Sequence, residues 1–436
     1  MTDLNIALVL IGGLVLVLSA VSDLLKQHGV SDVLVALVLG VAVGPVGLGL
    51  LDPSAWGDGT VVLEEATRLA VGVGLMGAAL RLPGGYFGAT WRAHTVLVVG
   101  AMVGMWLTSS LLIAWILALP APMALLIGAV VTPTDPVVAS SIVTGTVAER
   151  NLPGRIPCLI TAEAGLNDGL ALPLVLLGIA LVGGTGLESG VPAFIGQSLW
   201  QVGGAVAMGA ALGTATAHLL VFAERRMLIE RAGYLAIVVS LALLTLGSVR
   251  LVGSDGLLAV FVAGVAFGRV VPLSEREDAG TVAATVDLFF SLPVFTLIGM
   301  VLPWAAWAAL GWHGVALALA VLVLRRLPVV LAIHRWVTPL RSVGDALFVG
   351  WFGPIGVAAT FYAAHALRET GRETVFAVAL LLVAASVVAQ GLTATPLMRL
   401  YSRTCDTAKD DDDPGMDLAH SGRRALSNEE THASPR

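Results

Sequence analysis

Long apolar segments, each about the length of a membrane span, follow one another from residue 5 to about residue 400. Hydrophobic residues make up 57% of the 436-residue chain and charged residues only 12%, and the mean hydropathy is +0.90. Soluble proteins carry about 25% charged residues, whereas a helix needs about 20 apolar residues to cross a bilayer. We therefore expect an all-α polytopic protein embedded in a lipid bilayer, and exclude a soluble enzyme or a nucleic-acid-binding protein.

Cutting the apolar segments at their polar loops predicts thirteen transmembrane helices. Lysine and arginine concentrate in the odd-numbered loops, with exceptions at Arg250, Arg368 and Arg372, and the positive-inside rule places such loops in the cytoplasm. We expect a plasma-membrane protein with its N-terminus outside and its C-terminus in the cytoplasm. The first apolar segment lacks a preceding basic region, so it is expected to be a span rather than a cleaved signal. The predicted spans cover residues 5–21, 33–51, 60–79, 95–118, 123–143, 157–182, 195–222, 234–251, 255–271, 284–302, 313–334, 345–365 and 374–398.

Glycine and proline positions recur at a nearly constant distance along the chain. Gly40 recurs at Gly264 and Gly77 at Gly299, and the proline-containing stretch 133–136 lies 220 residues before a second one at 353–356. An offset of seven spans inverts the second copy relative to the first. The pattern predicts inverted six-helix repeats joined by one linker span, an arrangement found in secondary transporters.

Two prolines interrupt the apolar segment at residues 124–143. Pro133 and Pro136 remove two amide donors and should break the helix. The freed carbonyl oxygens need partners, which a bound cation or a crossing helix can supply. Asp135 lies at the break, where it could ligate a cation or cap the following half-helix. Because the matching stretch 353–356 also breaks a span, we predict two broken helices that cross near the membrane midplane.

Two acidic residues lie within the predicted span 157–182. Glu163 and Asp168 are five residues apart, so their side chains point about 140° apart around a helix and are expected to serve different sites. Asp168 lies about 16 Å into the span, too deep for an interfacial acid. Charges within a span are costly and indicate function. Asn167 offers an amide beside Asp168.

A basic pair, Arg325 and Arg326, lies within the predicted span 313–334. A buried arginine needs a carboxylate partner, and Glu163 is the natural candidate. One of the two arginines could instead extend toward the cytoplasmic interface. Burial disfavours an ionised carboxylate, so a buried acid can hold either a proton or a cation. Such a carboxylate, opened alternately to each side of the membrane, is sufficient for exchange.

These motifs resemble those of the monovalent cation:proton antiporter-1 family, sodium/proton exchangers of the Asn-Asp type. The resemblance rests on Thr134-Asp135-Pro136, on Glu163 four residues before Asn167-Asp168, on an arginine in a later span and on the stretch 350–356. It covers residues 5–400. It implies one transmembrane exchanger domain at residues 1–400, with core spans at about 95–182 and 313–398, the remaining spans serving as scaffold and dimer interface, and a disordered cytoplasmic tail at 401–436.

The resemblance also implies a role for each motif residue. Asp168 would bind the cation and the proton, Asp135 and the Thr134 carbonyl would complete a Na⁺ site, and Asn167 would join the site by orienting Asp168 or the half-helices. Glu163 would form a structural ion pair with Arg325 or Arg326. The implied activity is electroneutral exchange of Na⁺ for H⁺ by a homodimer that needs no cofactor and serves pH homeostasis.

Three departures from the family pattern leave the choice among Na⁺, Li⁺ and K⁺ open. Many members have a serine where this chain has Ala164, some a glutamate at the place of Gly77, and many an arginine at the place of Ile355. A different reading, a proton-coupled solute or anion symporter on the same fold, would require basic or neutral polar groups at the breaks rather than Asp135 and Asp168. A non-transporting channel or sensor would not need paired broken helices.

Overall fold

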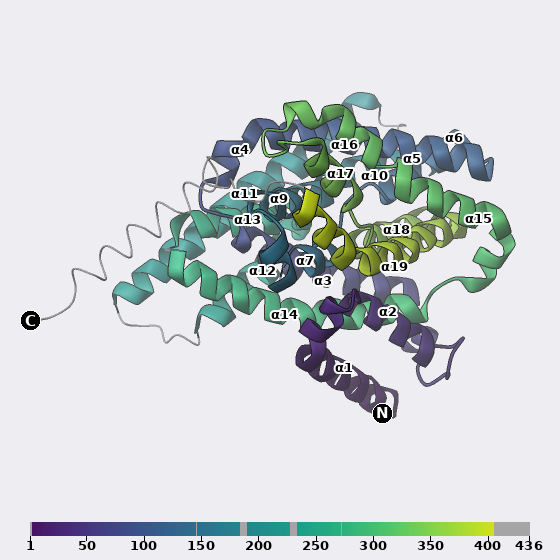
Figure 1. The fold of residues 1–436 in the computed structure, drawn as a ribbon, viewed down its shortest axis with the longest axis horizontal. Helices are drawn as coiled ribbons and strands as arrows, with labels where there is room; N and C mark the ends of the chain where they lie inside the picture. The colour runs from purple at the N-terminus through teal and green to yellow at the C-terminus, as the bar shows by residue number, and fades with distance from the viewer. Residues whose placement is uncertain (1, 145, 184–189, 227–232, 272, 405–436) are drawn as a thin grey trace, which may run out of the picture.

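The computed structural model describes residues 2–144, 146–183, 190–226, 233–271 and 273–404, and the regular secondary structure in these ranges is helical (Figure 1). The expected all-α fold is confirmed. Most of the expected tail, residues 405–436, lies outside the described residues. In chain order the elements are α1 (Thr2–Gln27), α2 (Asp32–Val43), η1 (Pro53–Trp56), α3 (Gly59–Arg81), α4 (Tyr86–Thr95), η2 (Val96–Ala101), α5 (Met102–Leu117), α6 (Ala121–Val130), α7 (Pro136–Val143), α8 (Thr146–Asn151), α9 (Arg155–Leu170), α10 (Leu172–Gly183), α11 (Val191–Arg225), α12 (Gly233–Leu251), α13 (Gly256–Val270), α14 (Leu273–Met300), α15 (Trp304–Leu324), α16 (Leu327–Ile333), η3 (His334–Trp336), α17 (Val343–Trp351), α18 (Val357–Thr370) and α19 (Glu373–Thr404).

Each of the thirteen predicted spans contains helix, but several bounds were wrong. Among the described residues, six helical segments are long and apolar enough to cross a membrane, and five shorter apolar helices accompany them. The span expected at 33–51 ends at Val43, because Gly44 precedes a proline. The helices expected from residues 95, 284 and 313 begin earlier, at Tyr86, Leu273 and Trp304, and the last helix runs to Thr404, into the expected tail.

Two spans expected to be continuous are interrupted. Ala171 separates α9 from α10, where Pro173 cannot donate a helical hydrogen bond. Arg325 and Arg326 separate α15 from α16, just before Pro328. These are a third and a fourth interruption in addition to the two expected ones, and the fourth buries both arginines.

The glycine correspondence reappears as reciprocal packing between the two halves of the chain. A Cβ atom on Gly299 of α14 would lie 3.0 Å from the Cα of Gly40 on α2, and one on Gly264 of α13 would lie 2.6 Å from the Cβ of Ala79 on α3. Only glycine permits these close crossings. Helix α2 of the first half thus packs on α14 of the second half, and α13 of the second half packs on α3 of the first. Such reciprocal contacts are expected of paired repeats.

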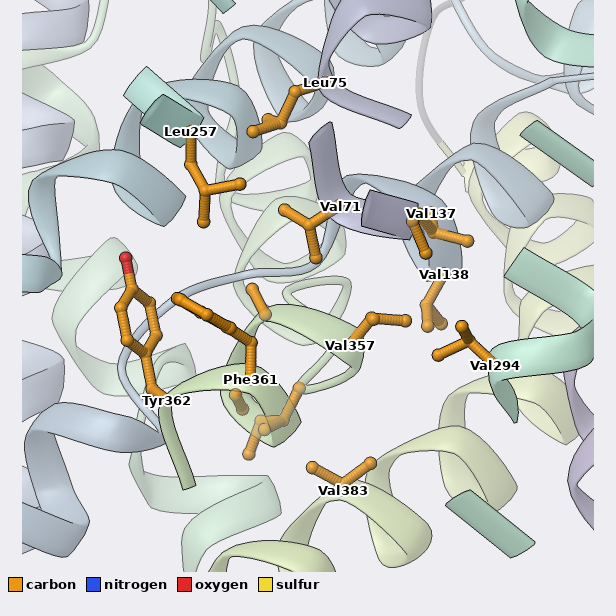
Figure 2. Packing of buried hydrophobic residues seen from close by; sticks show 14 of the residues in the cluster. Val71, Leu75, Val137, Val138, Leu257, Val294, Val357, Phe361, Tyr362 and Val383 are labelled. Atoms are coloured by element: carbon orange, nitrogen blue, oxygen red, sulfur yellow. The ribbon is translucent and has the colours of Figure 1, made fainter. Parts of the chain in front are cut away.

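The helices pack in two groups around a shared apolar interior. One group contains α2, α3 and α11–α14, and the other contains α5, α6, α10 and α15–α19. Helix α3 also packs on α7, α9 and α18, which joins the groups. Figure 2 shows the apolar side chains that meet there: Val71 of α3, Val137 of α7, Val294 of α14 and Val357 of α18 lie around the starts of the two half-helices.

Candidate functional site

Two interrupted helices cross in the interior of the protein. One interruption separates α6 from α7 at residues 131–135, and the other separates α17 from α18 at residues 352–356. The backbone amide of Asp135 donates to the carbonyl of Pro354 at 2.8 Å, so the two extended segments are hydrogen-bonded to each other. The two crossed broken helices predicted from the proline and glycine positions are confirmed.

Asp135 caps both of the half-helices that begin at this crossing. Its Oδ1 accepts from the amides of Val137 at 2.7 Å and Val138 at 3.0 Å, and its Oδ2 accepts from the amides of Val357 and, at 3.3 Å, Ala358. Four amide donors and two helix N-termini stabilise an anion here. The carboxylate therefore holds α7 and α18 together by their positive ends.

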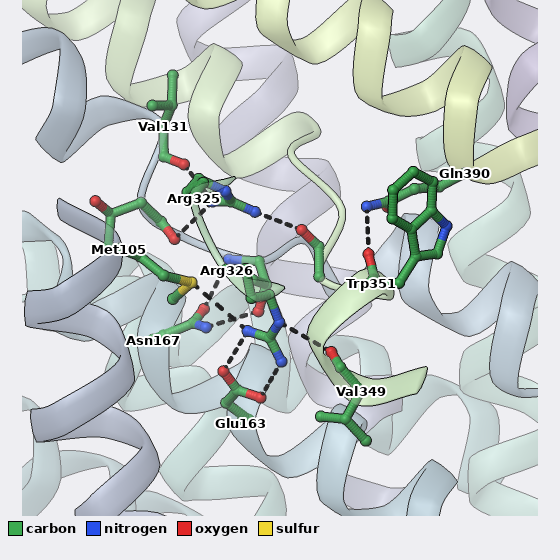
Figure 3. Close-up of polar contacts among 12 residues, drawn as sticks. Met105, Val131, Glu163, Asn167, Arg325, Arg326, Val349, Trp351 and Gln390 are labelled. Atoms are coloured by element: carbon green, nitrogen blue, oxygen red, sulfur yellow. Dashed lines mark hydrogen bonds and ion pairs between the residues drawn. The ribbon is translucent and has the colours of Figure 1, made fainter. Parts of the chain in front are cut away.

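Arg325 supplies the cationic partner of the freed carbonyl oxygens. Its guanidinium donates to the carbonyls of Val131 at 2.5 Å and Thr132 at 3.1 Å in the first interruption, and of Gly353 at 2.5 Å in the second. Figure 3 shows this fork between the two segments. The side chain is 3% exposed, so it does not extend toward the interface, and its hydrogen bonds among the described residues go to these carbonyls rather than to Glu163.

Glu163 pairs with Arg326 in a bidentate ion pair. The two carboxylate oxygens accept from Nη1 and Nη2 of Arg326 at 2.5 and 2.6 Å, and Nε donates to the carbonyl of Val349 at 3.0 Å (Figure 3). Both side chains are almost completely buried. The pair ties α9 to the start of α16 and to α17.

Asn167 connects α9 to the first interruption. Its Oδ1 accepts from the amide of Thr134 at 3.0 Å, and its Nδ2 donates to the hydroxyl of Thr134 at 2.6 Å. The oxygen and the nitrogen of the side-chain amide are thus both used in holding Thr134. This places the residue after it, Asp168, beside the crossing.

Asp168 differs from every other motif residue in its hydrogen bonding. The side chain is fully buried, and neither carboxylate oxygen has a hydrogen-bond partner among the described residues. Its backbone carbonyl accepts from the hydroxyl of Tyr362 at 2.5 Å. A buried carboxylate without partners is costly unless it binds a proton or a cation.

Three buried polar residues near the crossing were not predicted from the sequence. Asp287 of α14 accepts from the hydroxyl of Ser291 at 2.6 Å, and its position inside the expected span 284–302 was the available signal. Asp255 begins α13 as its N-cap, and the signal was an Asp before an apolar segment. Tyr362 gave no signal, because nothing in its local sequence shows that its hydroxyl meets Asp168.

A membrane-embedded bundle with two crossed broken helices and an unpartnered carboxylate beside them has the architecture of secondary transporters. The chain belongs to the sodium/hydrogen exchanger family: a family model described as "Sodium/hydrogen exchanger, transmembrane" matches residues 10–400. The family resemblance inferred from the motifs is thereby confirmed. The chain is a multi-pass membrane protein of a transporter family.

Curated relatives include fungal and bacterial antiporters. The chain is 33% identical over 375 residues to "Na(+)/H(+) antiporter 2" of Zygosaccharomyces rouxii, covering 83% of this chain and 46% of the relative. It is 32% identical to "Na(+)/H(+) antiporter" of Saccharomyces cerevisiae, covering 84% and 38%, and 25% identical to "K(+)/H(+) antiporter NhaP2" of Shewanella oneidensis, covering 90% and 66%. The chain thus spans less than half the length of the two yeast relatives.

A solved structure shares the fold. The sodium proton antiporter MjNhaP1 from Methanocaldococcus jannaschii at pH 8 superimposes with a TM-score of 0.68 at 18% identity, covering 91% of this chain and all of that chain. The two proteins therefore share their overall fold.

Proposed function

We propose that this chain exchanges a monovalent cation for protons across the membrane, with Asp168 as the carboxylate that carries each in turn. The observation that carries the proposal is the contrast at the crossing: Asp135 accepts four amide hydrogen bonds, whereas Asp168 accepts none. Of these two carboxylates, Asp168 is the one left to neutralise a cargo. The names of the relatives, which are Na⁺/H⁺ and K⁺/H⁺ antiporters, support the same activity.

In this scheme a cation and a proton compete for the same two oxygens. Thr134, held by Asn167, would add an oxygen to the cation site, and Asp135 would contribute its negative charge while capping the half-helices. Loss of the proton on one side of the membrane lets the cation bind, and the reverse occurs on the other side. In this scheme the Asp168 carboxylate is the group that would release one cargo and bind the other during the cycle.

The basic residues argue against anion symport on the same fold. Arg325 donates to three backbone carbonyls, and Arg326 is engaged by both oxygens of Glu163. Both guanidiniums are thus already engaged by groups of the protein itself.

Sodium is the first cation to test, with Li⁺ and K⁺ beside it. A plasma-membrane location with the N-terminus outside, a homodimer, and a core at about 95–182 and 313–398 moving against the remaining spans complete the proposal.

The test is cation-driven proton movement in proteoliposomes that contain the purified protein. Addition of Na⁺, Li⁺ or K⁺ should change the luminal pH of proteoliposomes that contain the wild type. The variant Asp168→Asn should fold and insert but show no exchange, because an amide can neither release a proton nor neutralise a cation. Asp58→Asn is the matched control, because Asp58 is an exposed N-cap at the start of α3. Robust pH-dependent exchange by Asp168→Asn would falsify the assignment.

A further inference from the structure

A small pocket lies toward the membrane face at which α3 begins and α18 ends. Its lining combines apolar side chains with Arg68, Arg250, Asp255, Tyr362 and His365. None of these residues belongs to the crossing or to the motifs of the proposed exchange site. The pocket therefore offers a polar environment on one side of Asp168 that the mechanism above does not use.

Asp255 is the buried carboxylate of this pocket. Its Oδ1 caps α13, accepting from the amides of Leu257 at 2.9 Å and Leu258 at 3.3 Å. Its Oδ2 is buried and has no hydrogen-bond partner among the described residues, and the residue is 3% exposed. Capping explains one oxygen of this carboxylate. Its Oδ2 resembles both carboxylate oxygens of Asp168, which are also buried without a hydrogen-bond partner among the described residues.

Tyr362 connects the pocket to Asp168. Its hydroxyl donates to the carbonyl of Asp168, and the same side chain lines the pocket. Figure 2 shows its ring beside Phe361, with the hydroxyl directed toward the part of the molecule that contains Leu257, two residues after Asp255. One fully buried side chain thus contacts both the exchange site and the pocket.

We propose that Asp255 is a second, weaker binding carboxylate for the transported monovalent cation, through which the cation passes between Asp168 and the solution on this face, with Tyr362 between the two carboxylates. The proposal rests on the exchange function proposed above. Arg68 and Arg250 line the same pocket and reduce its affinity for a cation. This suits a position along a path, where binding must be strong enough to admit an ion and weak enough to release it.

The experiment is a sided kinetic assay in oriented proteoliposomes, with Na⁺ added to one face at a time. Asp255→Asn keeps a side-chain oxygen for the cap of α13, since Asn is as good an N-cap as Asp, and removes only the charge. We expect the apparent KM for Na⁺ at the pocket's face to rise about fivefold or more, with the KM at the opposite face and the maximal rate within about twofold of wild type, because uniform binding is lost.

Asp58→Asn is the matched control for surface charge. Asp58 caps α3 with the same geometry, accepting from two amides at 3.0 and 3.3 Å, but in an exposed position. Its KM at both faces should equal that of wild type. Asp255→Ser, which also retains a capping oxygen, should reproduce the effect of Asp255→Asn if that variant is poorly produced.

The outcomes separate this proposal from the one on which it rests. If wild type exchanges and Asp255→Asn keeps the wild-type KM at both faces, or changes both equally, the second binding site is refuted and the exchange function stands. If Asp58→Asn raises the KM as much as Asp255→Asn, surface charge explains the effect and the proposal is refuted. If wild type moves no protons in response to any monovalent cation, both proposals fall together.

Discussion

Arg326 holds both carboxylate oxygens of Glu163, at 2.5 and 2.6 Å, across 163 residues of sequence. Both side chains are excluded from solvent, and Arg326 also donates to the carbonyl of Val349. The pair fixes α9, which carries Asn167 and Asp168, to the start of α16 and to α17. It therefore determines where Asp168 lies relative to the second interruption.

Replacing Glu163 by alanine should destabilise the protein. The substitution leaves Arg326 buried and unpaired, at a cost of about 3–5 kcal/mol. The measurement is the thermal unfolding temperature of the detergent-solubilised protein. Glu65→Ala is the control, because Glu65 forms an exposed ion pair with Arg68, and such pairs contribute about 0–1 kcal/mol. If Glu163→Ala melts like wild type and only its ion affinity changes, Glu163 is a cation ligand rather than a structural partner.

Arg325→Met should weaken the crossing itself. The change leaves the carbonyls of Val131, Thr132 and Gly353 without their donor, and each buried polar group left unpaired costs about 1–3 kcal/mol. We expect lower yield and a lower unfolding temperature, whereas Arg335→Met, at an exposed position, should match wild type. Equal stability of the two variants would show that water or lipid replaces the guanidinium without cost.

Gly356→Ala should disturb the capping of α18 by Asp135. A Cβ at this position would lie 2.5 Å from Oδ2 and 2.7 Å from Cγ of Asp135, which is already held by four amides. Overpacking of this kind costs about 1–3 kcal/mol, and exchange should fall with it. Gly203→Ala on α11, where nothing lies within 4 Å, is the control for a glycine in a helix. Full activity and stability of Gly356→Ala would contradict the close approach.

Exchange should be electroneutral, with one proton moved for each monovalent cation. Asp168 has two carboxylate oxygens without a hydrogen-bond partner among the described residues, whereas those of Asp135 accept from four amides, so we expect Asp168 alone to exchange its proton. The measurement is Na⁺-driven exchange in proteoliposomes with a potassium diffusion potential set by valinomycin. The rate and end point should be the same at every imposed potential. A systematic shift with potential would instead make Asp135 a second proton carrier.

The sequence predicted those parts of the site that depend on local chemistry. Pro133, Pro136 and the stretch 353–356 cannot continue a helix, so both interruptions followed from residue type alone. Charges inside apolar segments pointed to Glu163 and Asp168 in the same way. The bounds of the shorter helices were less accessible, because apolar loop residues such as those at 46–51 extend the hydropathy signal beyond the end of α2.

The remaining features depend on contacts between distant residues. Asp135 reaches the amide of Val357, 222 residues away, and Tyr362 reaches the carbonyl of Asp168, 194 residues away. No local pattern contains this information. The choice between Arg325 and Arg326 as the partner of Glu163 was open for the same reason, because adjacent residues at an interruption of the helix can point in unrelated directions.

The internal pairing of charges at the crossing bears on how tightly the two fluxes are coupled. Asp135 and Glu163 contribute two negative charges and Arg325 and Arg326 two positive ones, so these four residues sum to zero. With a proton or a cation on Asp168 the whole unit is neutral, and without either it carries one bare charge. Moving that charge through hydrocarbon is expensive, so under the proposed exchange mechanism the unloaded protein would be held back on whichever side it released its cargo. Return of the empty protein would then be suppressed by electrostatics.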